Sequence, residues 1–133
     1  MKVNELLRAA LALLDEPVGD AAGSWPHGVA VLTRQAIEST MTHWWQRVVP
    51  EMEDANWTEK WLALPSYLGR APVIGDAHYA WTVLSEACHH RAYEIGLTEP
   101  ELRTLLRTAN EFAKLVGARL AERAAKEPGA ATA

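Results

Sequence analysis

The residues best suited to chemistry in this chain lie in one short polar segment, residues 85–94. It contains Glu86, the adjacent histidines His89 and His90, and then Arg91. Imidazole titrates near neutral pH, so either histidine is suited to general acid–base chemistry, with Glu86 placed to orient it. A second interpretation is that the histidines and Arg91 are cations at the end of a helix, where they interact favourably with its dipole. The residues alone leave both interpretations open.

Metal binding is a third interpretation of the same segment. Glu86 and His89 have the spacing of the Glu-x-x-His element found in metal-binding helical bundles. Such sites need that element twice, together with further carboxylates. His43 follows Glu38 by five residues and His78 has no acid at the required spacing, so the second copy is missing. We therefore expect no metal and no other cofactor, and a metal-binding bundle enzyme using Glu86, His89 and His43 stays as an alternative.

Composition and motifs exclude several other functions. There is no glycine-rich phosphate loop and no Gly-x-Ser-x-Gly elbow. The only cysteine, Cys88, rules out an intrachain disulfide and lies on an apolar stripe, which indicates packing. The net charge of −4 is unlike that of a general duplex-binding protein, and Arg103 and Arg107 alternate with acids on a face that we expect to be solvated. No apolar run approaches the roughly 18 residues of a membrane span, and the N-terminus carries no signal-peptide pattern, so we expect a soluble cytoplasmic protein.

Apolar residues recur with helical spacing along the whole chain, and nowhere with the two-residue alternation of a strand. Thr98, Pro100 and Glu101 form the best helix-start signal, a capping box, while Pro50 and Pro65 are expected to end helices. The fold predicted is an all-α, single-domain, up-down bundle of four long helices and one short helix over residues 1–124, with a disordered tail at 125–133. The expected helices cover about 3–15, 26–49, 57–64, 75–90 and the stretch from the Thr98 cap to 123.

Two pairs of residues on the second predicted helix are candidates, one for a surface that binds a partner and the other for the functional site. Neighbours on a helix point about 100° apart, so of the adjacent Trp44 and Trp45 one is expected to face outward, where tryptophan favours interfaces. We therefore expect a homodimer that uses this pair. Arg34 and Glu38 lie four residues apart; they form a surface pair worth about 0.3–0.5 kcal/mol, or they line a groove with His90 if the two helices are adjacent.

Three stretches carry a resemblance to a known family. They are Leu84-Ser85-Glu86-Ala87-Cys88-His89-His90 with Tyr93, then Thr98-Glu99-Pro100-Glu101-Leu102, and Asn110-Glu111-Phe112-Ala113. Together they resemble the last two helices of HEPN domains, and Arg34-Gln35-Ala36-Ile37-Glu38 looks like the second helix of that family. The resemblance implies a small all-α bundle that commonly dimerises. It also implies, as in many members, a metal-independent ribonuclease of toxin–antitoxin and phage-defence systems with an Arg-x4–6-His motif.

The motif residues carry over only in part. His90 matches the motif histidine and Glu86 the polar residue, but Ser85 stands where the arginine belongs. That arginine would stabilise negative charge developing on phosphate, which serine cannot do. The resemblance therefore implies a degenerate, non-catalytic binding or regulatory module, dimeric, with a protein or RNA partner. The alternative is an active ribonuclease with His89 or His90 as general base, oriented by Glu86. Arg91, on the far side of the histidines, is a candidate to replace the missing arginine. The binding groove is expected to hold Ser85, Arg91, Tyr93, Arg34 and Glu38.

Overall fold

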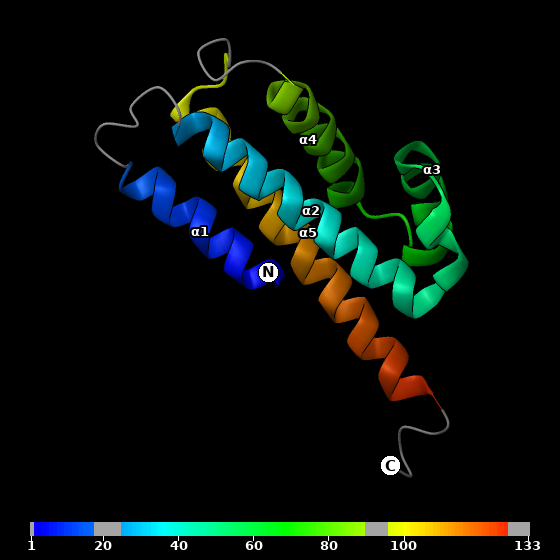
Figure 1. Ribbon diagram of the computed structural model, residues 1–133. Coiled ribbons are helices and arrows are strands. Elements are labelled where there is room, and N and C mark those ends of the chain that lie inside the picture. The colour runs from blue at the N-terminus through cyan, green and yellow to red at the C-terminus, as the bar shows by residue number, and fades with distance from the viewer. Residues whose placement is uncertain (1, 18–24, 90–95, 128–133) are drawn as a thin grey trace.

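The computed structural model describes residues 2–17, 25–89 and 96–127, and these residues contain helices but no strand (Figure 1). The predicted all-α class is therefore confirmed for the described part of the chain. None of its helices is long and apolar enough to cross a membrane. The elements are α1 (Val3–Asp15), α2 (Trp25–Val48), the 3-10 helix η2 (Pro50–Asp54), α3 (Trp57–Leu68), α4 (Pro72–His89) and α5 (Glu99–Lys126).

Helix α2 is the centre of the arrangement, because it packs against α1, α4, α5 and η2. Figure 1 shows α1 and α4 running in one direction, while α2 and α5 run in the other. Helices α1 and α5 also contact each other, although they come from opposite ends of the chain. Helix α3 lies next to the C-terminal end of α2 and beside the start of α4 (Figure 1). The described N- and C-terminal helices thus form one side of the molecule together with α2.

The two adjacent tryptophans of α2 are both buried, each only 1% exposed. The expectation that one of them faces outward and forms a dimer interface is wrong. Helix α2 has neighbours on several sides, so its buried positions come as adjacent pairs instead of a single narrow stripe. Trp45 meets Tyr67 of α3 edge to face, with ring centroids 5.3 Å apart. The buried pairs are Val29-Ala30, Ala36-Ile37, Thr40-Met41 and Trp44-Trp45.

Proline is tolerated at two places where the sequence predicted irregular structure. Pro65 does not end α3, which continues to Leu68 and stops at Gly69. The proline gives up one backbone hydrogen bond, but the helix on either side of it buries Leu64 and Leu68. Gly69 then takes a φ of 98°, a conformation that side chains other than glycine rarely adopt. Helix α4 begins at Pro72, three residues before its predicted start, because proline fits the first position of a helix.

The predicted capping box of α5 is present. The Thr98 hydroxyl accepts from the Glu101 backbone N–H at 3.2 Å, and the Glu101 carboxylate accepts from the Thr98 N–H at 3.0 Å. Helix α5 reaches Lys126, so residues 125 and 126 of the predicted tail are helical. Residues 128–133 lie outside the described part.

An aromatic cluster fastens α3 to the other helices. Trp61 stacks on His78 of α4 with centroids 4.8 Å apart and planes 6° apart, and its ring lies 5.7 Å from that of Phe112 on α5. Trp81 of α4 lies 6.1 Å from Trp61 and 5.8 Å from Trp57. Three helices therefore meet around the Trp61 ring.

Candidate binding sites

The predicted pair on α2 belongs to a polar cluster between α2 and α4. Arg34 Nε lies 3.3 Å from Glu38 Oε2, and the indole N–H of Trp81 donates to the same oxygen at 2.9 Å. The side chains of Arg34 and Glu38 are 32% and 21% exposed, so the pair is partly buried against α4. Of the two interpretations of this pair, the adjacency of α2 and α4 fits the one that places it between helices. Glu38 is held by an ion pair within α2 and by the hydrogen bond from Trp81, and the latter fastens α2 to α4.

Cys88 faces the same polar cluster. Burial raises the pKa of its thiol, and the neighbouring Arg34 guanidinium opposes this shift without cancelling it. A thiol with a raised pKa stays protonated at neutral pH and is a poor nucleophile. The half-buried Cys88 also packs against the apolar core. Both observations agree with a packing role.

The predicted catalytic segment is divided between two environments. Glu86 and His89 are exposed at the end of α4. Ser85, one turn before His89, is half-buried, and its hydroxyl is buried with no hydrogen-bond partner among the described residues. His90, Arg91 and Tyr93 lie outside the described residues. The structure thus brings Ser85 and Cys88 to the side of α4 that carries Trp81, and leaves Glu86 and His89 in solvent.

The residues proposed for a metal site do not come together. Within residues 2–17, 25–89 and 96–127, no three His, Cys, Asp or Glu side chains form a group able to hold a metal ion. His43 lies nine residues beyond Arg34 on α2, which is about 13 Å along a helix. Because Arg34 is the residue that meets Cys88, His43 is too far along α2 to join Glu86 and His89. It lines a different depression, beside the start of α1.

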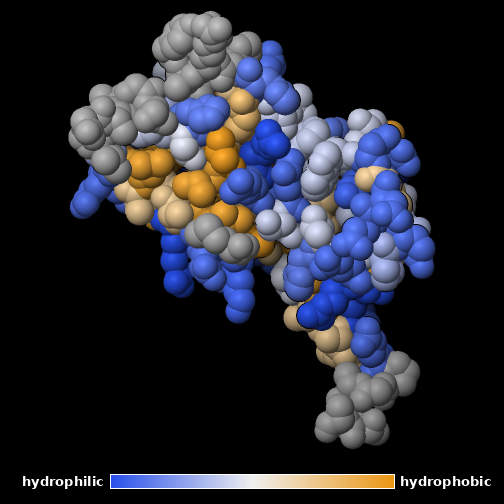
Figure 2. Space-filling model, in the orientation of Figure 1, coloured by the Kyte–Doolittle hydropathy of each residue, from blue (hydrophilic) through white to orange (hydrophobic). Residues whose placement is uncertain are grey.

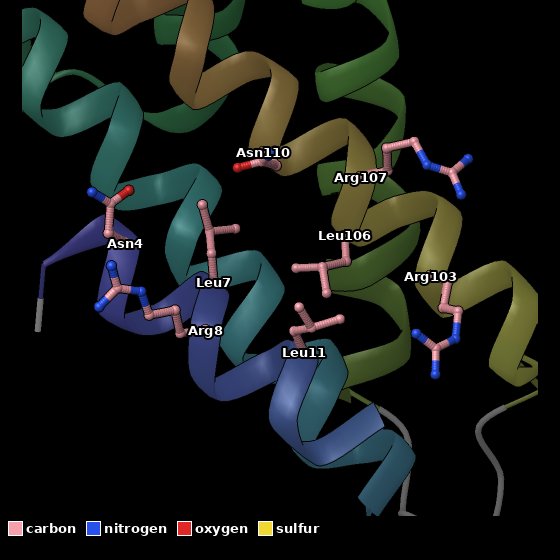
Figure 3. A pocket seen from close by; sticks show the side chains of 8 residues that line it. All are labelled: Asn4, Leu7, Arg8, Leu11, Arg103, Leu106, Arg107 and Asn110. Carbon is pink, nitrogen blue, oxygen red and sulfur yellow. The ribbon is translucent and has the colours of Figure 1, made fainter. Parts of the chain in front are cut away.

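A groove between α1 and α5 combines apolar and basic side chains, and sequence reasoning missed it. Its volume is about 500 Å3 (Figure 3). Leu7 and Leu106 form its floor, each less than a tenth exposed, and Leu11 rises above them at 45% exposure. Figure 3 shows the leucines gathered between the two helices, with arginines at either side. The complete lining is Asn4, Leu7, Arg8 and Leu11 from α1, with Arg103, Leu106, Arg107 and Asn110 from α5.

The arginines of this α1–α5 groove differ in their pairing. Arg103 forms an ion pair with Asp15 of α1 at 2.9 Å and another with Glu99 one turn earlier. The hydrogen bonds to Glu99 and Asp15 raise the pKa of Arg103, which remains fully charged. Arg8 and Arg107 are exposed, and no carboxylate in the described part of the chain pairs with either. The rim therefore carries two available positive charges, and the Arg103–Asp15 pair bridges the two helices.

Figure 2 shows apolar surface over α1 and the adjoining start of α2, bordered by hydrophilic side chains. The sequence held one signal for the groove, because α1 positions 4, 7, 8 and 11 and α5 positions 103, 106, 107 and 110 share the same helical spacing. That signal becomes informative only once the two helices are known to be neighbours.

Comparisons with family models, with curated proteins and with solved structures found no match for this chain.

Proposed function

We propose that this chain is a non-catalytic helical binding module whose binding surface is the α1–α5 groove. The observation that carries the proposal is the groove's composition: an apolar floor with a protruding Leu11, and two rim arginines that pair with no carboxylate of the described residues. Exposed apolar side chains in a concave surface rimmed by polar groups are typical of protein interaction sites. The polar residues that could do chemistry support the same conclusion, since Glu38 fastens two helices and Glu86 stands in solvent.

The resemblance adds a family and a setting to this proposal. On that ground the module is HEPN-like, an up-down bundle of four long helices and one short helix, with a regulatory role in a defence or toxin–antitoxin-like system and a protein or RNA partner. A homodimer remains part of the proposal on the resemblance alone, through surfaces other than Trp44 and Trp45. Light scattering measures the mass in solution, and a strict monomer at micromolar concentrations removes the dimer.

Selection from a random peptide library and a random single-stranded RNA library tests the binding function without assuming the class of ligand. Both libraries are selected on the wild-type chain and then depleted on the variant Arg8→Glu/Arg107→Glu, whose substituted residues are exposed and leave the core untouched. We expect enriched ligands that bind the wild type and lose affinity for the variant. If neither library is enriched, or if the enriched ligands bind both proteins equally, the groove is not the binding surface.

A metal-independent ribonuclease is the second candidate, and one contact favours it. The Arg34 guanidinium lies against the Cys88 thiol, next to His89, although it comes from α2. An arginine at that place is able to stabilise charge on a phosphate, the role left open by Ser85. RNA cleavage in EDTA decides between the candidates. Cleavage that is lost in both His89→Ala/His90→Ala and Arg34→Lys establishes the enzyme, and an inactive wild type leaves the binding module.

A further inference from the structure

The two walls of the α1–α5 groove have the geometry that receives a helix. Each wall presents residues at positions i, i+3, i+4 and i+7, which lie along one face of a helix for about two turns. Two neighbouring helices with such faces leave a channel in which a third helix can pack its side chains between theirs. Amphipathic helices bind proteins in this way, with apolar residues at the same spacing as anchors. Leu7, Leu11 and Leu106 supply the apolar contacts for those anchors.

The charged residues of the groove determine which charge a bound helix must carry. Arg8 from α1 and Arg107 from α5 are its available cations, because Arg103 is already engaged by Asp15 and Glu99. An apolar helix flanked by carboxylates would satisfy both cations while covering the leucines. A helix flanked by lysines would be repelled from the same place.

The same charges argue against two other occupants. A symmetric contact between two copies of this chain would place each rim of arginines against an identical rim. A single-stranded RNA would satisfy the arginines but would leave the leucines of the floor without a matching partner, and the groove residues include no aromatic ring on which bases stack. An acidic amphipathic helix would contact both the leucines of the floor and the arginines of the rim.

We propose that the α1–α5 groove docks an acidic amphipathic helix of another protein, with its apolar face on Leu7, Leu11 and Leu106 and its carboxylates on Arg8 and Arg107. This inference rests on the proposed binding function and names the class of ligand that the groove takes.

The test uses three labelled synthetic peptides and fluorescence anisotropy with the full chain. The first peptide is a helix with leucines at i, i+3, i+4 and i+7 and glutamates on the flanking positions. The second has lysine in place of every glutamate, and the third keeps the composition of the first in an order that breaks the leucine spacing. We expect the first to bind at least about tenfold more tightly than either of the others. Its preference over the lysine peptide comes from the charge pairs, since exposed pairs contribute up to about 1 kcal/mol each and a tenfold change in affinity is about 1.4 kcal/mol. Its preference over the third peptide comes from burial of the leucines, which only the regular spacing permits.

Charge reversal locates the binding in the groove. Arg8→Glu/Arg107→Glu is expected to weaken the glutamate peptide at least tenfold and to strengthen the lysine peptide. The matched control is Arg119→Glu/Arg123→Glu, which makes the same charge change on α5 beginning about 18 Å beyond Arg107. That control is expected to leave the preference between the peptides in place.

Any other result contradicts the proposal, and each such result points to a different explanation. Equal binding of the glutamate peptide and the broken-spacing peptide shows that charge alone attracts them. Equal weakening by both double variants places the site outside the groove. A single-stranded RNA oligonucleotide could also bind more tightly than the glutamate peptide. If Arg8→Glu/Arg107→Glu abolishes that binding, the groove is a nucleic-acid site. The last result overturns this inference and leaves the proposed binding function in place, whereas an absence of any groove-dependent ligand in the library selection removes both.

Discussion

Replacing Trp61 by alanine removes the ring around which α3, α4 and α5 meet. Its side chain is buried, and its ring contacts His78, Trp81 and Phe112. No other aromatic ring of α3 contacts both α4 and α5 in the described residues. We therefore expect Trp61→Ala to lower the free energy of unfolding strongly.

The size of the loss follows from the buried area. A tryptophan buries about 200 Å2, and at about 25 cal/mol per Å2 this gives about 5 kcal/mol as an upper bound. Alanine keeps a small part of that, and Trp→Ala substitutions in cores cost about 3–5 kcal/mol, so we expect about 4 kcal/mol. Domains are stable by about 5–15 kcal/mol in all, so the variant loses a large share of its stability. For a chain of 133 residues, 4 kcal/mol corresponds to a fall in Tm of about 14 °C.

Urea unfolding followed by circular dichroism measures this loss, and a thermal scan measures the Tm. The matched control is Leu62→Ala, one residue further along α3, where the side chain is 72% exposed. That variant should change stability by no more than about 0.5 kcal/mol. If Trp61→Ala costs less than about 1.5 kcal/mol, or no more than Leu62→Ala, the aromatic cluster does not fasten α3 and the reasoning from its contacts is refuted.

Three further predictions concern single polar groups. Trp81→Phe keeps an aromatic ring but removes the N–H that donates to the partly exposed Glu38, so urea unfolding should show a loss of about 1 kcal/mol; an unchanged midpoint would mean that the bond contributes nothing. Hydrogen bonding to the Thr98 backbone N–H lowers the pKa of Glu101, and the hydrogen bond with the Thr98 side chain lowers it by a smaller amount. The unfolded chain therefore binds that proton more readily, and the contribution to stability is present above the ordinary carboxyl pKa and lost as the pH falls through the lowered value. The Tm of wild type and of Glu101→Gln should accordingly converge in acid, and parallel curves would contradict the assignment. Burial raises the pKa of Cys88, so iodoacetamide at pH 8 should alkylate the native chain much more slowly than the urea-unfolded chain, and equal rates would show an accessible thiolate.

Local signals in the sequence predicted much of the fold. Helix α1 has its predicted bounds because its apolar stripe is regular, and the capping box at Thr98 placed the start of α5. The Arg34–Glu38 pair follows from helical spacing alone. In each case the residues that decide the structure lie within a turn or two of one another.

The errors have a common physical origin, which is contact between distant segments. Trp44 and Trp45 are both buried because α2 has neighbours on several sides, a fact that no window of its own sequence contains. Pro65 is carried inside a helix because Leu68, beyond it, is buried. The α1–α5 groove was missed for the same reason: Arg107 is exposed, as predicted, but nothing near it in the sequence shows that α1 lies alongside.

The position of α1 connects the fold to the proposed function. Helix α1 packs mainly on α2 and α5, and its Leu6, Ala10 and Leu14 are buried, each at most 3% exposed. Its apolar arc is wider than two neighbours can cover, so Leu11 remains 45% exposed at the edge. Helix α2, with more neighbours, has no such remainder even at two adjacent tryptophans. At the edge of the bundle, the α1–α5 groove combines this partly exposed apolar arc with arginines of two helices that pair with no carboxylate in the described part of the chain. One more helix of opposite charge would cover the leucines and pair with the arginines, and for this reason we propose the groove as the surface for a partner.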